Sequence, residues 1–296
     1  MNKQDLISMI GTFAFLATIL SSGAVAAAGR TVKGVETWEG EVHVKEMVIV
    51  EKGAILRILP GTRVLLSGED NNDDGIRDGS IMVSGNLIVE GERKRPVIFS
   101  PLDPRKPWGE IFIKEGKGVI RYAVFERAQW GLHVHDGDVT VEHAMFQENE
   151  AGVKMKGTGA AFSRCTFRDN GIALRFWDGG PTVADTVIEN NNVGLFYREG
   201  KGGGKIVRSV IANREWDLKI GDWAVGTLDV SGNYWGTAED EKIRRRIQDF
   251  REDDRGSILI LPTLPHPPVE CGADLPEYPS FEKELLKEAG IGGVSR

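Results

Sequence analysis

A repeat of 21 residues in the middle of the chain is the strongest constraint on its fold. Its marks are separated by intervals of 21, 21, 21 and 23 residues and are Phe125, Phe146, Phe167, Ile188 and Ile211. Three further positions of the repeat are also apolar or aromatic. The residues five before the marks are Ile120, Val141, Phe162, Val183 and Ile206, and those seven after are Leu132, Val153, Leu174, Leu195 and Leu218. The residues nine after the marks are Val134, Met155, Phe176, Tyr197 and Ile220. All of these positions are apolar or aromatic, whereas a random draw at 41% hydrophobic content would fill about eight of them.

This period, with apolar residues alternating along short segments, predicts an all-β solenoid. We expect a right-handed parallel β-helix with coils of about 21 residues, whose strands stack about 4.8 Å apart around a continuous core. A leucine-rich repeat has a similar period, but its Leu-x-x-Leu-x-Leu frame is absent.

Polar residues and glycines recur in the same frame. Asn149, Asn170 and Asn191 stand three residues after successive marks, where stacked amides can hydrogen-bond from coil to coil. Gly131, Gly152 and Gly194 stand six after their marks, where the turn requires either a positive φ or a close backbone approach.

Composition limits the class of partner. The chain of 296 residues has a formal net charge of -7, so bulk electrostatics gives no reason to expect a nucleic acid. It has two cysteines, too few for a disulfide framework. Cys165 takes a repeat position that other coils fill with small residues, and we interpret it as a small buried residue.

The chain divides into three segments. Residues 1–28 carry Lys3, an uncharged run and the small residues Ala26, Ala27 and Ala28, which together predict a cleaved signal peptide. The uncharged run is long enough to span a bilayer if it is retained, so an anchor is the alternative. We expect export to a periplasmic or extracellular location, with no membrane association after cleavage. The β-helix domain is assigned to residues 29–262, and residues 263–296 to a tail in which residues 281–289 can form a short helix.

The two ends of the solenoid need caps, because open sheet edges invite aggregation. We expect residues 38–50 to form an irregular first coil. Residues 241–250 are predicted to form a short capping helix, and residues 257–261 a closing strand.

Three stretches carry a resemblance to a known fold group. They are Leu59-Pro60-Gly61-Thr62, the segment 91–99 (GERKRPVIF) followed by Trp108-Gly109, and Gly232-Asn233-Tyr234-Trp235-Gly236. Over residues 37–262 the chain resembles the pectate-lyase-like superfamily of right-handed β-helices, in particular its uncharacterised repeat proteins. The pectate-lyase and polygalacturonase signatures of that superfamily are missing, so the resemblance implies a fold and no activity.

One loop matches a calcium-binding pattern. The segment 70–78 reads D-x-[DN]-x-[DN]-G-x-x-D, with oxygen donors at alternate positions and a glycine at the bend. The predicted ligands are the side chains of Asp70, Asn72, Asp74 and Asp78 and the carbonyl of Ile76. We expect a structural Ca²⁺; the alternative is a solvated acidic turn. The loop precedes the candidate binding residues by several coils, which argues against a shared catalytic site.

The outward positions of one strand form a basic and aromatic stripe. Its first column is His133, Lys154, Arg175, Phe196 and Lys219, and its second is His135, Lys156, Trp177, Arg198 and Gly221, with Phe112 and Lys114 from the preceding coil. Stacked like charges destabilise a sheet unless something compensates them. Either the nearby Asp136, Asp138, Asp178 and Glu199 neutralise them, or the stripe binds an anionic polysaccharide, with aromatic rings stacking on sugars. The residues expected to bind are His133, His135, Lys154, Lys156, Arg175, Trp177, Phe196 and Arg198.

Three classes of function follow. We expect a non-catalytic carbohydrate-binding or cell-envelope protein. A polysaccharide lyase is the catalytic alternative, with His133 beside Lys154 as a base and a carboxylate neutraliser. A hydrolase would need two carboxylates at matched separation; the only pair next to the outward strand is Asp136 and Asp138, and a turn explains this Asp-Gly-Asp segment better. A purely structural envelope component is the third class.

Overall fold

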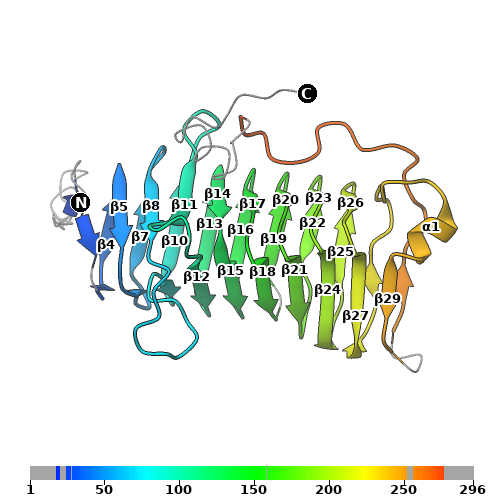
Figure 1. Cartoon of the computed structure of the whole chain (residues 1–296), viewed down its shortest axis with the longest axis horizontal. Coiled ribbons are helices and arrows are strands. Elements are labelled where there is room, and N and C mark those ends of the chain that lie inside the picture. Colours follow the sequence, from blue (N-terminus) through cyan, green and yellow to red (C-terminus); the bar gives the residue numbers. More distant parts are fainter. Residues whose placement is uncertain (1–17, 21–24, 28, 158, 252–255, 277–296) are drawn as a thin grey trace, which may run out of the picture.

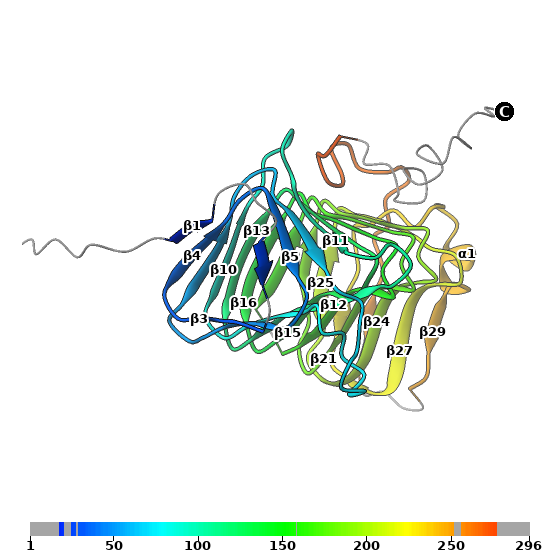
Figure 2. The ribbon, with the colours of Figure 1, turned by 60° about the vertical axis from the view of Figure 1, so that its left-hand side comes forward.

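The computed structural model describes residues 18–20, 25–27, 29–157, 159–251 and 256–276. It shows a parallel β-helix, in which successive coils stack along one axis (Figure 1). Most coils contribute one strand to each of three parallel sheets, here named A, B and C, so that the chain closes around a common interior (Figure 2). The all-β prediction is therefore confirmed.

The strands are short, and their bounds are as follows. Sheet A contains β1 (Thr18–Leu20), β4 (Val35–Trp38), β7 (Ile55–Ile58), β10 (Asn86–Glu90), β13 (Lys117–Arg121), β16 (Asp138–Glu142), β19 (Ala160–Ser163), β22 (Thr182–Ala184), β25 (Gly204–Val207), β28 (Leu228–Asp229) and β30 (Ile258–Leu259). Sheet B contains β2 (Val25–Ala27), β5 (Glu41–Val44), β8 (Arg63–Leu66), β11 (Val97–Pro101), β14 (Ala123–Glu126), β17 (Met145–Gln147), β20 (Thr166–Arg168), β23 (Val187–Glu189) and β26 (Val210–Ala212). Sheet C contains β3 (Thr31–Val32), β6 (Val48–Val50), β9 (Ile81–Val83), β12 (Trp108–Lys114), β15 (Ala128–His135), β18 (Ala151–Lys156), β21 (Ile172–Trp177), β24 (Val193–Lys201), β27 (Trp216–Val225) and β29 (Ile247–Asp249).

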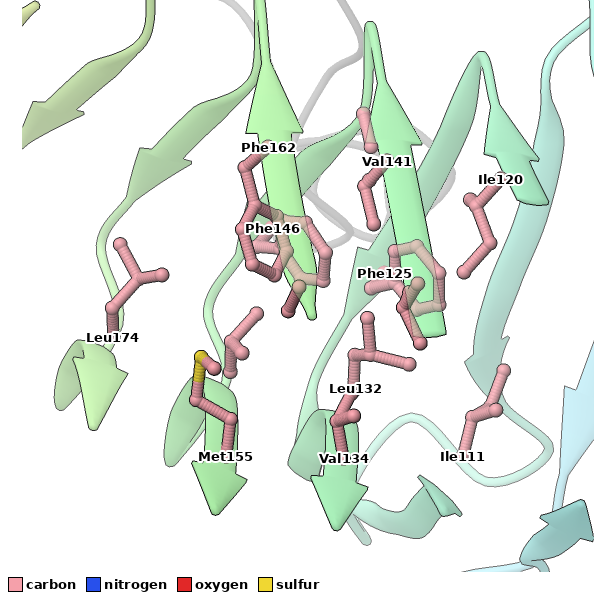
Figure 3. Close-up of a cluster of buried hydrophobic side chains, with 14 of the residues drawn as sticks. Ile111, Ile120, Phe125, Leu132, Val134, Val141, Phe146, Met155, Phe162 and Leu174 are labelled. Carbon is pink, nitrogen blue, oxygen red and sulfur yellow. The ribbon is translucent and has the colours of Figure 1, made fainter. Parts of the chain in front are cut away.

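The predicted repeat positions lie directly over one another. In sheet C, Leu132 pairs with Val153 and Val153 with Leu174, and in sheet B Phe125 pairs with Phe146 and Phe146 with Phe167. These side chains are fully buried and fill the interior between the sheets (Figure 3). The Phe146 ring stacks on the rings above and below it at centroid distances of 4.7 Å.

The asparagines form a continuous buried ladder. The Nδ2 of Asn149 donates to Oδ1 of Asn170 at 2.9 Å, and Asn170 donates to Asn191 at 2.8 Å. The sequence frame missed a fourth member, Asn213, which accepts from Asn191 at 2.8 Å. Its own amide and backbone N–H donate to the carboxylate of Asp217, which ends the ladder.

The recurring glycines are required because the backbones of adjacent coils approach each other closely. A Cβ on Gly131 would lie 2.8 Å from the carbonyl oxygen of Gly152, and a Cβ on Gly152 would lie 2.8 Å from that of Ala173. Close approach, and not a positive φ, therefore selects glycine at these two positions.

The ends differ in part from the prediction. Residues 38–50 are regular and supply the end of β4 and all of β5 and β6. The prediction that they form an irregular first coil is therefore wrong. The helix α1 (Asp240–Arg244) is shorter than predicted, because residues 247–249 form β29 and pair with β27 at the edge of sheet C. The closing strand is present as β30.

The described part of the tail runs back along the solenoid (Figure 1). Leu275 packs on the outer face of sheet B against Ile98, Val124 and Met145, and Asp274 pairs with Arg93 at 2.7 Å. The helix predicted within residues 281–289 lies outside the described residues.

Of the predicted signal peptide, only β1 and β2 are described, and the remaining residues up to 28 lie outside the described ranges. Over the described residues, no helix combines the length and the apolar composition that crossing a bilayer needs. Cys165 is fully buried, as predicted, and Cys165 and Cys271 are both free thiols.

Candidate functional site

The stripe on the outer face of sheet C has the register that the repeat predicts. Phe112 pairs with His133, His133 with Lys154, Lys154 with Arg175, and so on to Phe196 and Lys219: this is the first column. In the second column Lys114, His135, Lys156 and Trp177 pair in turn. The paired residues of β21 and β24 end at Phe176 and Tyr197, so Arg198 is not paired with Trp177, but its guanidinium lies 5.8 Å from the Trp177 ring centroid.

The cations of the stripe divide into two groups. Lys156 lies 4.0 Å from a carboxylate oxygen of Asp178, and Arg198 lies 3.5 Å from one of Glu199. Neutralisation by a nearby acidic residue thus holds for Lys156 and Arg198. Among the described residues, no carboxylate forms an ion pair within 4.0 Å with the other cations of the stripe, Lys114, Lys154, Arg175 and Lys219.

Aromatic rings lie beside Lys154 and Arg175. The Nζ of Lys154 lies 4.5 Å from the Trp130 ring centroid and 5.9 Å from that of Trp177. The guanidinium of Arg175 lies 5.5 Å from the Phe196 ring centroid. Such contacts hold a cation over a π face without neutralising its charge.

Burial affects both of these cations. It lowers the pKa of Lys154; the Glu110 carboxylate opposes this effect, and the charges of Arg175 and Arg198 add to it. Burial and the Arg198 charge also lower the pKa of Arg175. The Nε of Arg175 is buried and hydrogen-bonds to none of the described residues. A bound anion would relieve the mutual repulsion and supply the missing acceptor.

At the N-terminal end of the stripe the side chains form a hydrogen-bonded chain. Nδ1 of His133 lies 2.8 Å from Oε2 of Glu110, and its Nε2 lies 2.9 Å from Nε2 of His135. The His133 ring also stacks on Phe112 at 4.2 Å. Glu110 and His133 are 8% and 6% exposed, so the pair is held in a largely dry environment, although strand alternation puts both on the outer face.

Local backbone geometry positions Glu110. The register of β12 shifts between Glu110 and Ile111, so that Glu110 pairs with Trp130. The backbone N–H of Glu110 donates to Oγ of Ser80 at 3.2 Å, which fixes it to the start of β9. Sequence reasoning missed Glu110 and Trp130; counting back two residues from Phe112 puts Glu110 on the outer face.

A cavity of about 490 Å³ lies over the hydrogen-bonded side chains of Glu110, His133 and His135. Its lining includes Glu110, Phe112, Lys114, Trp130, His133, His135 and Lys154. It also includes Gly75 and Ile76 from the loop at residues 69–79, which connects β8 to β9. The expectation that this loop stands apart from the stripe is therefore wrong.

Two contacts hold the loop in place. Nε2 of Gln129 donates to the carbonyl of Gly75 at 3.3 Å, and Nζ of Lys106 lies 2.6 Å from Oε1 of Glu69. The loop leaves the solenoid after β8 of sheet B and returns at β9 of sheet C. Because β9 pairs directly with β12, the loop lies close to the strand on which the stripe begins.

The predicted calcium ligands are held by hydrogen bonds within the loop. Asp70 accepts from the backbone N–H groups of Asp74 and Gly75, and Asp78 accepts from the backbone and side chain of Asn71. Their oxygen donors suit a hard cation. However, no three His, Cys, Asp or Glu side chains gather in a way that could hold a metal within the described ranges. The predicted ligands also include the Asn72 side chain and the Ile76 carbonyl, so the calcium site stays a prediction.

No protein-family model, no curated protein and no solved structure matches this chain.

Proposed function

We propose that this protein binds an anionic polysaccharide along the outer face of sheet C. The observation that carries the proposal is the stacking of Lys154 on Arg175 in adjacent strands, half-buried, flanked by aromatic rings and with no described carboxylate to pair with. Adjacent rungs lie about 4.8 Å apart, close to the rise of an extended sugar chain, so carboxylates on successive sugars can meet successive cations. Phe196 is partly exposed and can contact a sugar ring, whereas Trp177 is only 8% exposed and packs against Lys154, Arg198 and His135.

Affinity for charged and neutral polymers tests the proposal. The full chain is titrated with oligogalacturonate and with a neutral maltooligosaccharide of the same length, at two salt concentrations. We expect binding of the uronate alone, weakening as salt rises because exposed charges are screened. Equal affinity for both oligomers would contradict the proposal. Binding of neither would favour a purely structural envelope component.

Charge reversal locates the binding face. Lys154→Glu combined with Arg175→Glu should weaken uronate binding at least tenfold, a change of about 1.4 kcal/mol. Lys117→Glu is the matched control, because Lys117 is exposed on sheet A, away from the stripe. Unchanged affinity in the double variant would exclude sheet C as the binding face.

A polysaccharide lyase is the second candidate function. The hydrogen-bonded chain from Glu110 to His135 favours it, because a histidine oriented by a carboxylate is a common form of general base. Hydrolysis is less well supported, since Glu110 is the one carboxylate among the described residues that line the cavity, and glycoside hydrolysis commonly uses two.

We also propose membership of the pectate-lyase-like superfamily and export by a cleaved signal peptide. The turn residue Gly61, at a φ of +81°, and Asn233, which hydrogen-bonds to the backbone of Ile206 and Val230, support the first proposal. Left-handed coils in an experimental structure would contradict it. The composition of residues 1–28 supports the second. The N-terminus of the protein recovered from its producing cell should lie near residue 29; an intact Met1 would indicate a retained anchor.

A bound Ca²⁺ at residues 70–78 is proposed as a stabiliser of the loop that lines the cavity. The donor types support it.

A further inference from the structure

Two histidines project side by side from β15. His133 and His135 are two residues apart, so strand alternation puts both imidazoles on the outer face of sheet C. Their Nε2 atoms lie 2.9 Å apart. Aromatic packing fixes both rings, because the Phe112 ring centroid lies 4.2 Å from that of His133 and 5.1 Å from that of His135. The two nitrogens are therefore held close together by the fold itself.

The two rings meet at an angle. Their centroids are 4.5 Å apart, and their planes are nearly perpendicular, at 89°. The centroid distance exceeds the Nε2–Nε2 distance by less than the diameter of an imidazole ring, so the rings do not point head-on at each other. A hydrogen bond between two ring nitrogens is strongest when it is nearly linear. An ion that binds both nitrogens needs the bent arrangement instead: two nitrogens about 2.1 Å from one ion, at a right angle, lie about 3 Å apart.

Glu110 orients the first of these two imidazoles. Its Oε2 accepts the Nδ1–H of His133 at 2.8 Å, and both side chains are largely buried. With the hydrogen on Nδ1, neutral His133 has its lone pair on Nε2, the nitrogen that lies next to His135. A histidine that binds a metal commonly donates its other ring N–H to a carboxylate, which fixes the tautomer and makes the ligand more basic. Glu110 is placed to do this for His133.

We propose that His133 and His135 bind one divalent transition-metal ion through their Nε2 atoms, with Glu110 as the positioning residue for His133. Imidazole nitrogens suit Zn²⁺, Cu²⁺, Ni²⁺ and Fe²⁺, whereas Ca²⁺ takes oxygen ligands. The site therefore differs in chemistry from the calcium loop predicted at residues 70–78. It is also independent of polysaccharide binding. The ion takes the place of the hydrogen between the two Nε2 atoms, which leaves as a proton or stays on the free nitrogen of His135.

The remaining coordination positions of such an ion face the cavity. Both histidines line it, and His135 is partly exposed there. Within the described ranges, no third His, Cys, Asp or Glu side chain completes a metal-binding group. Water, or a ligand that enters the cavity, therefore fills the other positions. An ion with open positions exchanges its ligands, as the zinc of catalytic sites does.

Charges in the adjacent strands set the affinity of the site. Lysines flank both histidines in the register: Lys114 from β12, and Lys154 and Lys156 from β18. Their positive charges oppose a dication, whereas the Glu110 carboxylate attracts one. Removing a lysine charge should therefore strengthen metal binding, and removing the Glu110 charge should weaken it. Damage to the local structure would weaken binding in both cases, so the two signs separate electrostatics from folding.

Metal titration of the full chain, without any sugar, tests the site. The protein is treated with a chelator and dialysed, and then titrated with Zn²⁺ by calorimetry and with Co²⁺ by visible absorbance. We expect saturable binding and Co²⁺ absorption bands typical of nitrogen ligands. The Asp70→Ala/Asp74→Ala variant removes two donors of the predicted calcium loop and should keep both signals. Absence of saturable binding in wild type, or loss of the Co²⁺ bands in the loop variant, would overturn the proposal.

Single variants assign the roles. His133→Ala and His135→Ala should each abolish the Co²⁺ bands, whereas the control His43→Ala, in sheet B, should leave them unchanged. Glu110→Gln should weaken Zn²⁺ binding by about 10–100-fold, the usual effect of losing the partner of a metal-bound histidine. Lys154→Met keeps the apolar stem of the side chain and should strengthen it. Intact bands in either β15 histidine variant would overturn the ligand assignment, and weaker binding in Lys154→Met as well as in Glu110→Gln would overturn the positioning role of Glu110.

Discussion

The buried asparagine ladder should contribute several kcal/mol to the stability of the solenoid, and Asn170→Ala is the change that measures it. Asn170 is 1% exposed and its side chain makes four hydrogen bonds. Its Nδ2 donates to Asn191 and to the carbonyl of Phe146, and its Oδ1 accepts from the backbone and side chain of Asn149.

The magnitude follows from which groups lose a side-chain partner. The Asn149 amide keeps its bond to the carbonyl of Phe125, and Oδ1 of Asn191 keeps the backbone N–H of residue 170. The backbone N–H of Asn149 and the carbonyl of Phe146 both lose the partner that Asn170 provided. At about 1–3 kcal/mol for each buried group left unsatisfied, the free energy of unfolding should fall by about 2–6 kcal/mol.

Urea denaturation followed by circular dichroism measures this loss, and Asn192→Ala is the matched control. Asn192 lies in the corresponding turn of the next coil but is exposed, so truncating it should change the free energy of unfolding by less than about 0.5 kcal/mol. Similar transition midpoints for the two variants, with the same dependence on urea, would refute the idea that the ladder stabilises the fold.

Three further predictions concern the core, pH and calcium. Phe146→Ala should lower the free energy of unfolding by about 3–5 kcal/mol in urea denaturation, because the ring is fully buried between two stacked neighbours; a loss under 1 kcal/mol would contradict this packing. The lowered pKa of His135 stabilises the fold above the unfolded-state pKa of about 6.5, and this contribution disappears as the pH falls towards about 4. The melting temperature of wild type should therefore fall more than that of His135→Gln over this interval, and parallel curves would contradict the linkage. Ca²⁺ should raise the melting temperature of wild type and not of the Asp70→Ala/Asp74→Ala variant; an equal effect on both would place any calcium site elsewhere.

Sequence periodicity predicts much of this structure because each coil repeats the same packing problem. Leu132, Val153 and Leu174 had to meet in the interior once the period was known, and strand alternation then put Lys154 and Arg175 outside. Departures from the period were not predictable in the same way. The register shift in β12 decides which residue pairs with Trp130, and a repeat count does not reveal it.

The C-terminal cap shows tertiary structure overriding local preference. The charged segment after residue 240 favours a helix, but the edge of β27 has backbone groups that need partners. Residues 247–249 supply them as β29, and Arg246 reaches the buried carboxylate of Asp217 at 2.7 Å. Burial raises the pKa of Asp217, and Arg246 opposes that effect. The helix therefore ends at Arg244, before these contacts begin.

Charged residues are arranged differently on the outer faces of sheets A and C, and this difference supports the proposed binding face. On sheet A, Arg121 pairs with Glu142 in the next strand at 3.0 Å, and Lys205 with Asp229 at 3.7 Å, so adjacent rungs carry opposite charges. On sheet C, Lys154 stacks on Arg175, an arrangement that costs up to about 1 kcal/mol when like charges are directly opposed. The same core period would tolerate an acidic residue at either position. An unfavourable charge stack on a fold that can so easily avoid it is best explained by a ligand of opposite charge, and the buried Glu110–His133 pair lies at the end of that same stack.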